Sequence, residues 1–202
     1  METQETYARL HQQVTDRGPW QQTASGNAFF LGYPDHLAVR IDDIATSLSN
    51  QCRYNGHVKH FYSVAQHAMM VSQWMEEDGC DTISQYAGLH HDSAEAYTGD
   101  IIAQMKWLTP EFKEREERVE KAVNKALGVD TSSITASIVK DYDFLALATE
   151  VRDVLNPNQT EYSWGDLPEP RDEEILAMDP TSARVHFLGR HVELQQQLGM
   201  RS

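Results

Sequence analysis

Apolar residues recur at helical spacing along most of this chain, and that repeat restricts it to an all-α fold. Val64, Ala68, Val71 and Met75 step by four, three and four residues, which places them on one face of a helix. The same spacing, with capping and breaking residues at the ends, predicts helices over about 3–16, 82–96, 110–127, 132–155 and 180–198. A short extended piece is expected near the N-terminus, at about residues 29–34, and a small hairpin around the glycines is an alternative for it.

Length and charge restrict the class of partner. The chain has 202 residues, of which 40% are hydrophobic, so residues 1–202 are expected to form one domain with a sizeable core. Acids outnumber bases 31 to 17, and the net charge of −14 argues against nucleic acids and anionic membranes as partners. No apolar run reaches the roughly 18 residues of a membrane span. No signal peptide is visible and Cys52 and Cys80 are expected to be reduced, so a cytoplasmic protein is predicted.

Imidazoles and carboxylates lie on the core side of three expected helices. His67 and His91 fall on the apolar stripes of their helices, Asp92 follows His91, and Asp143 lies on the apolar stripe of the helix over 132–155. Buried carboxylates without a partner are costly, so a cation is the economical explanation. These four groups suit one divalent transition metal, such as Mn, Fe, Co, Ni or Zn. The alternative is a buried His–Asp hydrogen-bond network that holds no metal.

Two further carboxylates can belong to the same site. Glu95 stands about one helical turn after the His91-Asp92 pair, where a carboxylate can move protons during a metal-assisted hydrolysis. The alternative for Glu95 is an ordinary exposed helix glutamate. Asp100 follows a helix-breaking turn that can return it over the same pocket, although it can also cap a helix that begins at the next residue.

The order and local sequence of these residues resemble a known family. His67, then His91-Asp92, then Asp143 resemble the ligand set of the HD-domain metal-dependent phosphohydrolases. Residues 91–101 look like the H-D-x-x-E-x-x-T-G-D-[IL] stretch of the small nucleotide-cleaving branch of that family. The resemblance covers roughly residues 41–155, and the helix after it is expected to pack on this core.

Two neighbouring groups within that branch are similar to this chain. Residues 52–67 and 143–150 resemble phage members, which include dATP triphosphohydrolases. The bacterial deoxyribonucleoside 5′-monophosphatases carry an Arg-Trp pair at about the place of Arg53-Tyr54. The local sequence therefore leaves both groups open.

The resemblance also implies roles for individual residues. It implies that Glu95 transfers a proton, that Asp100 positions water or sugar, and that Arg53 and Lys106 bind substrate phosphate. The two-metal branches carry additional histidines before the last Asp, and since none lies between His91 and His186 here, one metal is expected. Homo-oligomers are common in the resembling families, so this chain is expected to oligomerise. The ligands carried over are His67, His91, Asp92 and Asp143.

Cations near the expected site are few. No Lys or Arg occurs between residues 60 and 105, so Arg53, Lys59 and Lys106, which flank that stretch, are the natural phosphate contacts. His57 and His60 can assist them, and Lys59 can equally be a solvated surface lysine. The ring of Tyr54 can stack on a base or sugar, or it can be a core aromatic.

The expected function is metal-dependent hydrolysis of a deoxynucleotide. The first reading is a dATP or dNTP triphosphohydrolase, which gives deoxynucleoside and triphosphate and acts in the host cytoplasm if phage-encoded. The alternative is a 5′-nucleotidase that releases phosphate from deoxynucleoside monophosphates. A second alternative is a non-catalytic, metal-containing HD regulatory module.

Other parts of the chain carry weaker signals. Glu150 can orient a ligand or a substrate-binding arginine, or form a buried salt bridge with Arg152 or Arg53. Residues 157–180 show no chemistry, and 157–172 are expected to be a loop. His186 and His191 in the last helix are not expected to be ligands, and the apolar stripe of that helix is expected to serve packing.

Overall fold

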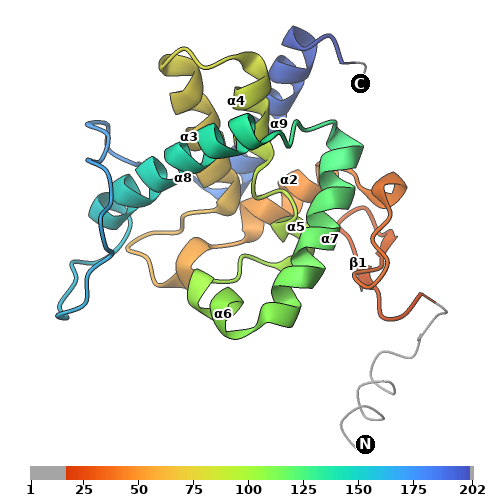
Figure 1. The fold of residues 1–202 in the computed structure, drawn as a ribbon, viewed down its shortest axis with the longest axis horizontal. Coiled ribbons are helices and arrows are strands. Elements are labelled where there is room, and N and C mark those ends of the chain that lie inside the picture. Colours follow the sequence, from red (N-terminus) through yellow and green to blue (C-terminus); the bar gives the residue numbers. More distant parts are fainter. Residues whose placement is uncertain (1–16, 201–202) are drawn as a thin grey trace, which may run out of the picture.

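The computed structural model describes residues 17–200, and its regular structure is almost entirely helical, which confirms the all-α prediction (Figure 1). The expected helix over 3–16 lies outside the described residues. Among the described residues, none of the helices combines the length and the hydropathy needed to cross a lipid bilayer.

The extended N-terminal piece is smaller than expected and lies earlier in the chain. Strand β1 (Gln21–Gln22) pairs antiparallel with β2 (Ala28–Phe29), and a turn over residues 23–27 joins them. The expected extended piece over 29–34 is therefore wrong for residues 31–33, where the chain turns, while the alternative of a small hairpin is met earlier, around Gly26. Phe29 anchors the hairpin, because its buried ring stacks on Tyr97 with centroids 3.9 Å apart.

The helix that carries His67 forms as the sequence predicts. It is α3 (Val64–Glu77), and the side chain of Ser63 caps its N-terminus by accepting a hydrogen bond from the backbone of Gln66. The stripe of Val64, Ala68, Val71 and Met75 is fully buried, as expected. His67 lies next to that stripe and is fully buried as well.

The expected continuous helix over 82–96 is wrong, because it breaks at the His91-Asp92 pair. Helix α4 (Thr82–His90) ends there, residues 91–94 form tight turns, and α5 (Glu95–Thr98) follows. The backbone of Ser93 bonds the carbonyl of His90, and that of Glu95 bonds Asp92, both at 3.0 Å. These three-residue steps tighten the chain, so that the neighbouring side chains of His91 and Asp92 reach one site.

The remaining elements surround these helices. They are η1 (His36–Ala38), α2 (Ile41–Asn50), η2 (Arg53–Gly56), α6 (Ala103–Leu108), α7 (Pro110–Leu127), α8 (Ser133–Asp153) and α9 (Pro180–Gln197). Helix α9 packs against α2, α3 and α4, while α8 packs against α3 and α4 from another side (Figure 1). The expected helices over 110–127, 132–155 and 180–198 are thereby confirmed to within a few residues.

The core lies in two clusters that share α3 and α4. One joins them to α2, α7 and α9, and Ala183, Phe187 and Leu194 of α9 are buried in it, as the stripe of the last helix predicts. The other joins them to α8 through Val71, Met75 and side chains such as Val139 and Ala146. Because α3, α4 and α8 are packed together, polar groups on their facing sides are brought to one place.

Candidate active site

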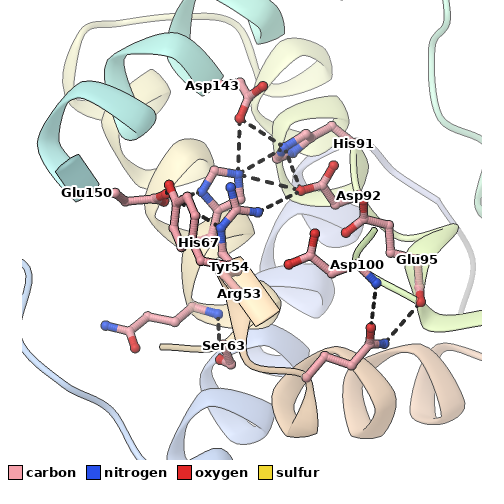
Figure 2. Close-up of polar contacts among 12 residues, drawn as sticks. Arg53, Tyr54, Ser63, His67, His91, Asp92, Glu95, Asp100, Asp143 and Glu150 are labelled. Carbon is pink, nitrogen blue, oxygen red and sulfur yellow. Dashed lines mark hydrogen bonds and ion pairs between the residues drawn. The ribbon is translucent and has the colours of Figure 1, made fainter. Parts of the chain in front are cut away.

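Four side chains from α3, α8 and the turn after α4 converge (Figure 2). The Nε2 atoms of His67 and His91 are 3.2 Å apart, and Asp92 Oδ2 lies 3.2 Å from His91 Nε2. Asp143 Oδ1 lies 3.2 Å from His67 Nε2 and 3.8 Å from His91 Nε2. The structure therefore brings together the four residues for which the sequence predicts a metal site, with ligand atoms of His67, His91 and Asp92 within 4.8 Å of one another.

The hydrogen bonds of the two imidazoles fit a cation at this point. His91 Nδ1 lies 2.7 Å from the carbonyl oxygen of Gly88, which can only accept, so this nitrogen carries the proton. His67 Nδ1 lies 2.6 Å from the carboxylate of Glu150 and donates in the same way. If both imidazoles are neutral, their Nε2 atoms carry lone pairs. These lone pairs point toward each other and toward the carboxylates of Asp92 and Asp143, so a divalent metal between them would bind all four groups.

Glu150 connects the four expected metal ligands to Arg53. Its carboxylate is fully buried and accepts hydrogen bonds from His67, from the hydroxyl of Tyr62 at 2.9 Å and from the hydroxyl of Tyr54. Arg53 Nε lies 3.5 Å away. Burial raises the pKa of Glu150, but Arg53 and His67 outweigh it and lower the pKa to about 2.

Glu150 therefore contacts both an expected ligand and the expected phosphate-binding arginine. Pairing with Arg152 is wrong, because the guanidinium of Arg152 binds Asp153. Tyr62 was not predicted, since a buried tyrosine just before a helix looks like any core aromatic.

Arg53 and Tyr54 occupy a strained turn at the edge of the site. Within η2, Tyr54 and Asn55 adopt φ values of 56° and 52°, a left-handed conformation that costs roughly 1–2 kcal/mol per non-glycine residue. The hydrogen bond to Glu150 holds Tyr54 in this conformation. Arg53 Nη1 lies 3.3 Å from Asp92 Oδ2, so the guanidinium lies directly beside the four expected metal ligands. Strain of this kind is concentrated at functional sites.

Glu95 is buried next to the cluster and is not the exposed helix residue of the alternative interpretation. Lys106 Nζ lies 3.0 Å from Glu95 Oε1 and 2.8 Å from Glu116 Oε1, while the other oxygen of Glu95 has no partner in the described structure. Burial raises the pKa of Glu95 to about 9, with Asp92 and Asp100 adding to the effect and Lys106 opposing it. Glu95 is thus a carboxyl able to hold a proton near neutral pH.

Asp100 faces the same pocket, and its alternative role as a helix cap is wrong. Helix α6 begins at Ala103, with Ile102 at the N-cap position and no side-chain cap. Gln51 holds the backbone on either side of the turn. Its side-chain oxygen accepts a hydrogen bond from the backbone N–H of Asp100 at 2.9 Å, and its amide donates one to the carbonyl of Glu95 at 3.0 Å. Burial raises the pKa of Asp100, and Asp92 adds to it.

A cavity of about 270 Å³ opens onto these groups. Its polar lining includes the expected site residues Arg53, Asp92, Glu95, Asp100, Lys106 and Asp143, together with Gln104, which was not predicted. Its apolar lining, apart from Tyr54, was not predicted and includes Ile101, Phe144, Leu147 and Trp164. The sequence indicated no functional residue in 157–180, but Trp164 from this stretch lines the pocket. The sequence feature that could have indicated it is a single tryptophan in an otherwise polar loop.

Three expected phosphate contacts lie away from this pocket. Lys59 Nζ donates to the carbonyls of Arg152 and Asp153 at 3.2 and 3.1 Å, where it caps the C-terminal end of α8. His57 is exposed and does not line the pocket, and His60 lines a separate small cavity beside Val154. The expectation that Lys59, His57 and His60 contact phosphate is therefore wrong in this structure. A basic residue can be close to the site in sequence while its side chain points away from the pocket.

Comparison with known proteins shows the family of this chain. The uncharacterized protein YfdR of Escherichia coli K12 is 39% identical over 133 residues, which cover 66% of this chain and 71% of that protein. An uncharacterized protein of Rhodobacter capsulatus is 28% identical over 192 residues, covering 89% of this chain and 97% of its own length. A family model described as YfbR-like 5′-deoxynucleotidase matches residues 43–156. The chain belongs to this YfbR-like family of HD-domain phosphohydrolases.

Proposed function

We propose that this protein is a metal-dependent 5′-deoxynucleotidase that releases inorganic phosphate from deoxynucleoside monophosphates. The family match supports this alternative over the dATP triphosphohydrolase that the local sequence placed first. The observation that carries the proposal is the charge balance of the pocket. Among the described residues that line it, the cationic side chains are Arg53 and Lys106.

Both cations are already paired with carboxylates. Arg53 lies between Asp92 and Glu150, and Lys106 lies between Glu95 and Glu116. A phosphate monoester carries about two negative charges near neutral pH, which a metal and one arginine can balance. A triphosphate carries more charge and needs more cations than this pocket supplies, so the monophosphate fits better.

The proposed ligands of the metal are His67, His91, Asp92 and Asp143. A divalent metal held there would supply a Lewis acid that polarises the phosphate and lowers the pKa of a water molecule. Arg53 then binds the phosphate oxygens and offsets the charge that builds on them. The chemistry forms one bond from water oxygen to phosphorus and breaks the bond from phosphorus to the 5′ oxygen.

Two carboxyl groups serve the proton and the sugar. The departing 5′ oxygen must gain a proton, and Glu95 is placed to deliver it, because its carboxyl is buried in the pocket wall close to the proposed ligand Asp92. Lys106 holds Glu95 in position through the contact at 3.0 Å. Asp100 lines the pocket beside Glu95 and orients water or the sugar.

Product analysis tests the proposal. The purified protein is loaded with Co or Mn, incubated with each dNMP and each dNTP, and the products are resolved by chromatography. Phosphate and deoxynucleoside are expected from dNMPs, with dNTPs intact. Triphosphate released from dATP would support the triphosphohydrolase instead, and no turnover of any nucleotide would support the regulatory module.

Replacement of Glu95 tests the role given to it. Glu95→Gln keeps the shape of the side chain but cannot exchange a proton, so kcat is expected to fall by about 10²–10⁴-fold while bound metal is retained. Metal is measured by elemental analysis and kcat by phosphate release. Glu114→Gln, an exposed change on α7, is the control and should behave as wild type. An unchanged kcat for Glu95→Gln would remove Glu95 from the mechanism.

A further inference from the structure

The apolar end of the pocket has no role in the chemistry proposed above. Tyr54 and Trp164 meet there edge to face, with ring centroids 6.4 Å apart and ring planes at 85°. Phe144 and Leu147 of α8 line the same pocket, and both lie within four residues of Asp143. An aromatic corner therefore adjoins the group of residues proposed to hold the metal and the phosphate.

Tyr54 is held firmly in this corner. Its hydroxyl is bound to buried Glu150, its backbone is in the left-handed turn, and Arg53 lies 5.5 Å from the centre of its ring. The polar end of Tyr54 is thus satisfied inside the protein, and its ring is left as an apolar wall. The fixed ring of Tyr54 therefore gives the indole of Trp164 a defined surface to pack against.

Trp164 reaches the pocket from a loop that is fastened at one end. Near α9 the loop is tied down, because Arg171 binds Asp78 at 2.6 Å and the backbone of Ile175 binds the carboxylate of Asp153 at 3.0 Å. In the described structure, the hydrogen bonds that residues 158–167 make join that stretch to itself. The position of Trp164 at the pocket therefore rests on aromatic contact.

Trp164 also leaves a large apolar surface uncovered. Its side chain is 43% exposed although it lines a cavity, and its indole has no hydrogen-bond partner among the described residues. A flat, apolar, π-bearing ligand would cover that surface, and the ligand class that the proposed function brings into this pocket contains such a group in its nucleobase.

We infer that Trp164, with Tyr54 at its edge, forms the stacking platform for the nucleobase of the substrate. The inference rests on the proposed function, because it places the base at the aromatic end and the phosphate at the arginine end of one cavity. Stacking recognises the face of a base and not its hydrogen-bonding edge, so all bases are accepted. Purines, with the larger face, are expected to bind more tightly than pyrimidines.

A substrate without a base separates stacking from other roles. Trp164→Ala is expected to lower kcat/KM for dAMP roughly tenfold, mainly through KM, and to leave kcat/KM for 2-deoxyribose 5-phosphate unchanged. Trp164→Phe should restore most of the loss. Tyr162→Ala is the matched control, because Tyr162 is an exposed aromatic of the same loop that does not line the pocket.

Binding of deoxyadenosine, which has no phosphate, tests the inference independently of hydrolysis. Calorimetry is expected to show roughly tenfold weaker binding to Trp164→Ala than to wild type or Tyr162→Ala. Equal losses of kcat/KM for dAMP and 2-deoxyribose 5-phosphate in Trp164→Ala would mean that Trp164 only packs the loop. Deoxyadenosine binding that is unmeasurable in wild type, or equal in wild type and Trp164→Ala, would also contradict the stacking platform. If wild type binds deoxyadenosine through Trp164 but hydrolyses no nucleotide, the proposed function fails and the platform stands.

Discussion

At the scale of single residues, Glu150 contacts both a proposed metal ligand and the proposed phosphate-binding arginine. It is fully buried, and its four partners reach it from α3, from η2 and from the segment between them. A buried carboxylate with one partner missing leaves an uncompensated charge, so this group is costly unless every partner is present. Glu150 orients His67 toward the proposed metal and Arg53 toward the proposed phosphate, and one substitution should disturb both.

Glu150→Gln tests this coupling. The amide keeps the shape but removes the charge that pairs with Arg53 and orients His67, so metal affinity is expected to fall by about 10–100-fold. Competition with a metal chelator measures the affinity. Glu114→Gln on the exposed face of α7 is the control. Metal affinity equal to wild type would show that His67 is oriented without Glu150.

At the scale of elements, the break between α4 and α6 shapes the pocket. The tight turns at residues 91–94 present His91 and Asp92 to one site, and α5 ends at Gly99, whose φ and ψ are 84° and 150°. That region of backbone space is essentially restricted to glycine. The reversal places Asp100 over the pocket, so the positions of Glu95 and Asp100 depend on one glycine.

Gly99→Ala is expected to reduce the free energy of unfolding by about 1–3 kcal/mol, measured by urea denaturation. The cause is backbone strain and not a clash, because the nearest atom to an added Cβ is 4.0 Å away. Gly189→Ala on α9 is the matched control, since this helical glycine has open space around it and alanine should be neutral or stabilise by up to about 1 kcal/mol. Equal destabilisation of the two variants would contradict the strain argument.

At the scale of the whole molecule, α9 packs against the end of α4 that carries the site residues. His191 Nδ1 on α9 lies 2.9 Å from His90 Nε2, and His90 directly precedes the proposed ligand His91. His90 also contacts the hydroxyl of Ser93 at 2.9 Å, so both of its nitrogens are occupied in the core. Burial lowers the pKa of His191 to about 4, which makes the packing of α9 sensitive to acid.

The pH dependence of folding tests this support. The unfolded chain protonates His191 near pH 6.5, whereas the folded chain does so only near pH 4, so the unfolded state binds the extra proton between these values. The free energy of unfolding is therefore expected to fall as pH decreases from 6.5 to 4, by up to roughly 3 kcal/mol from this group. His191→Gln should flatten the dependence by up to one proton, and His186→Gln, an exposed change on the same helix, should not. Parallel pH profiles for wild type and His191→Gln would contradict the assignment.

The sequence by itself determined the all-α class, the helical faces and the residues that converge on the site. Helical spacing is a local property, so it places His67 on an inward face without reference to the rest of the chain, whereas the side chain of Asp143 is 44% exposed and only borders the core. The family resemblance, carried by the motif over residues 91–101, is confirmed. The roles given to individual site residues stay predictions.

Tertiary structure decided which groups meet across long distances. Tyr62 and His67 bind Glu150 over separations of 88 and 83 residues, and Trp164 reaches Tyr54 from a loop with no periodic pattern. Lys59 stands close in sequence to the expected site yet caps α8 instead. The physical reason is that spacing sets the face of a helix on which a side chain lies, while packing between helices decides which faces and loops come together.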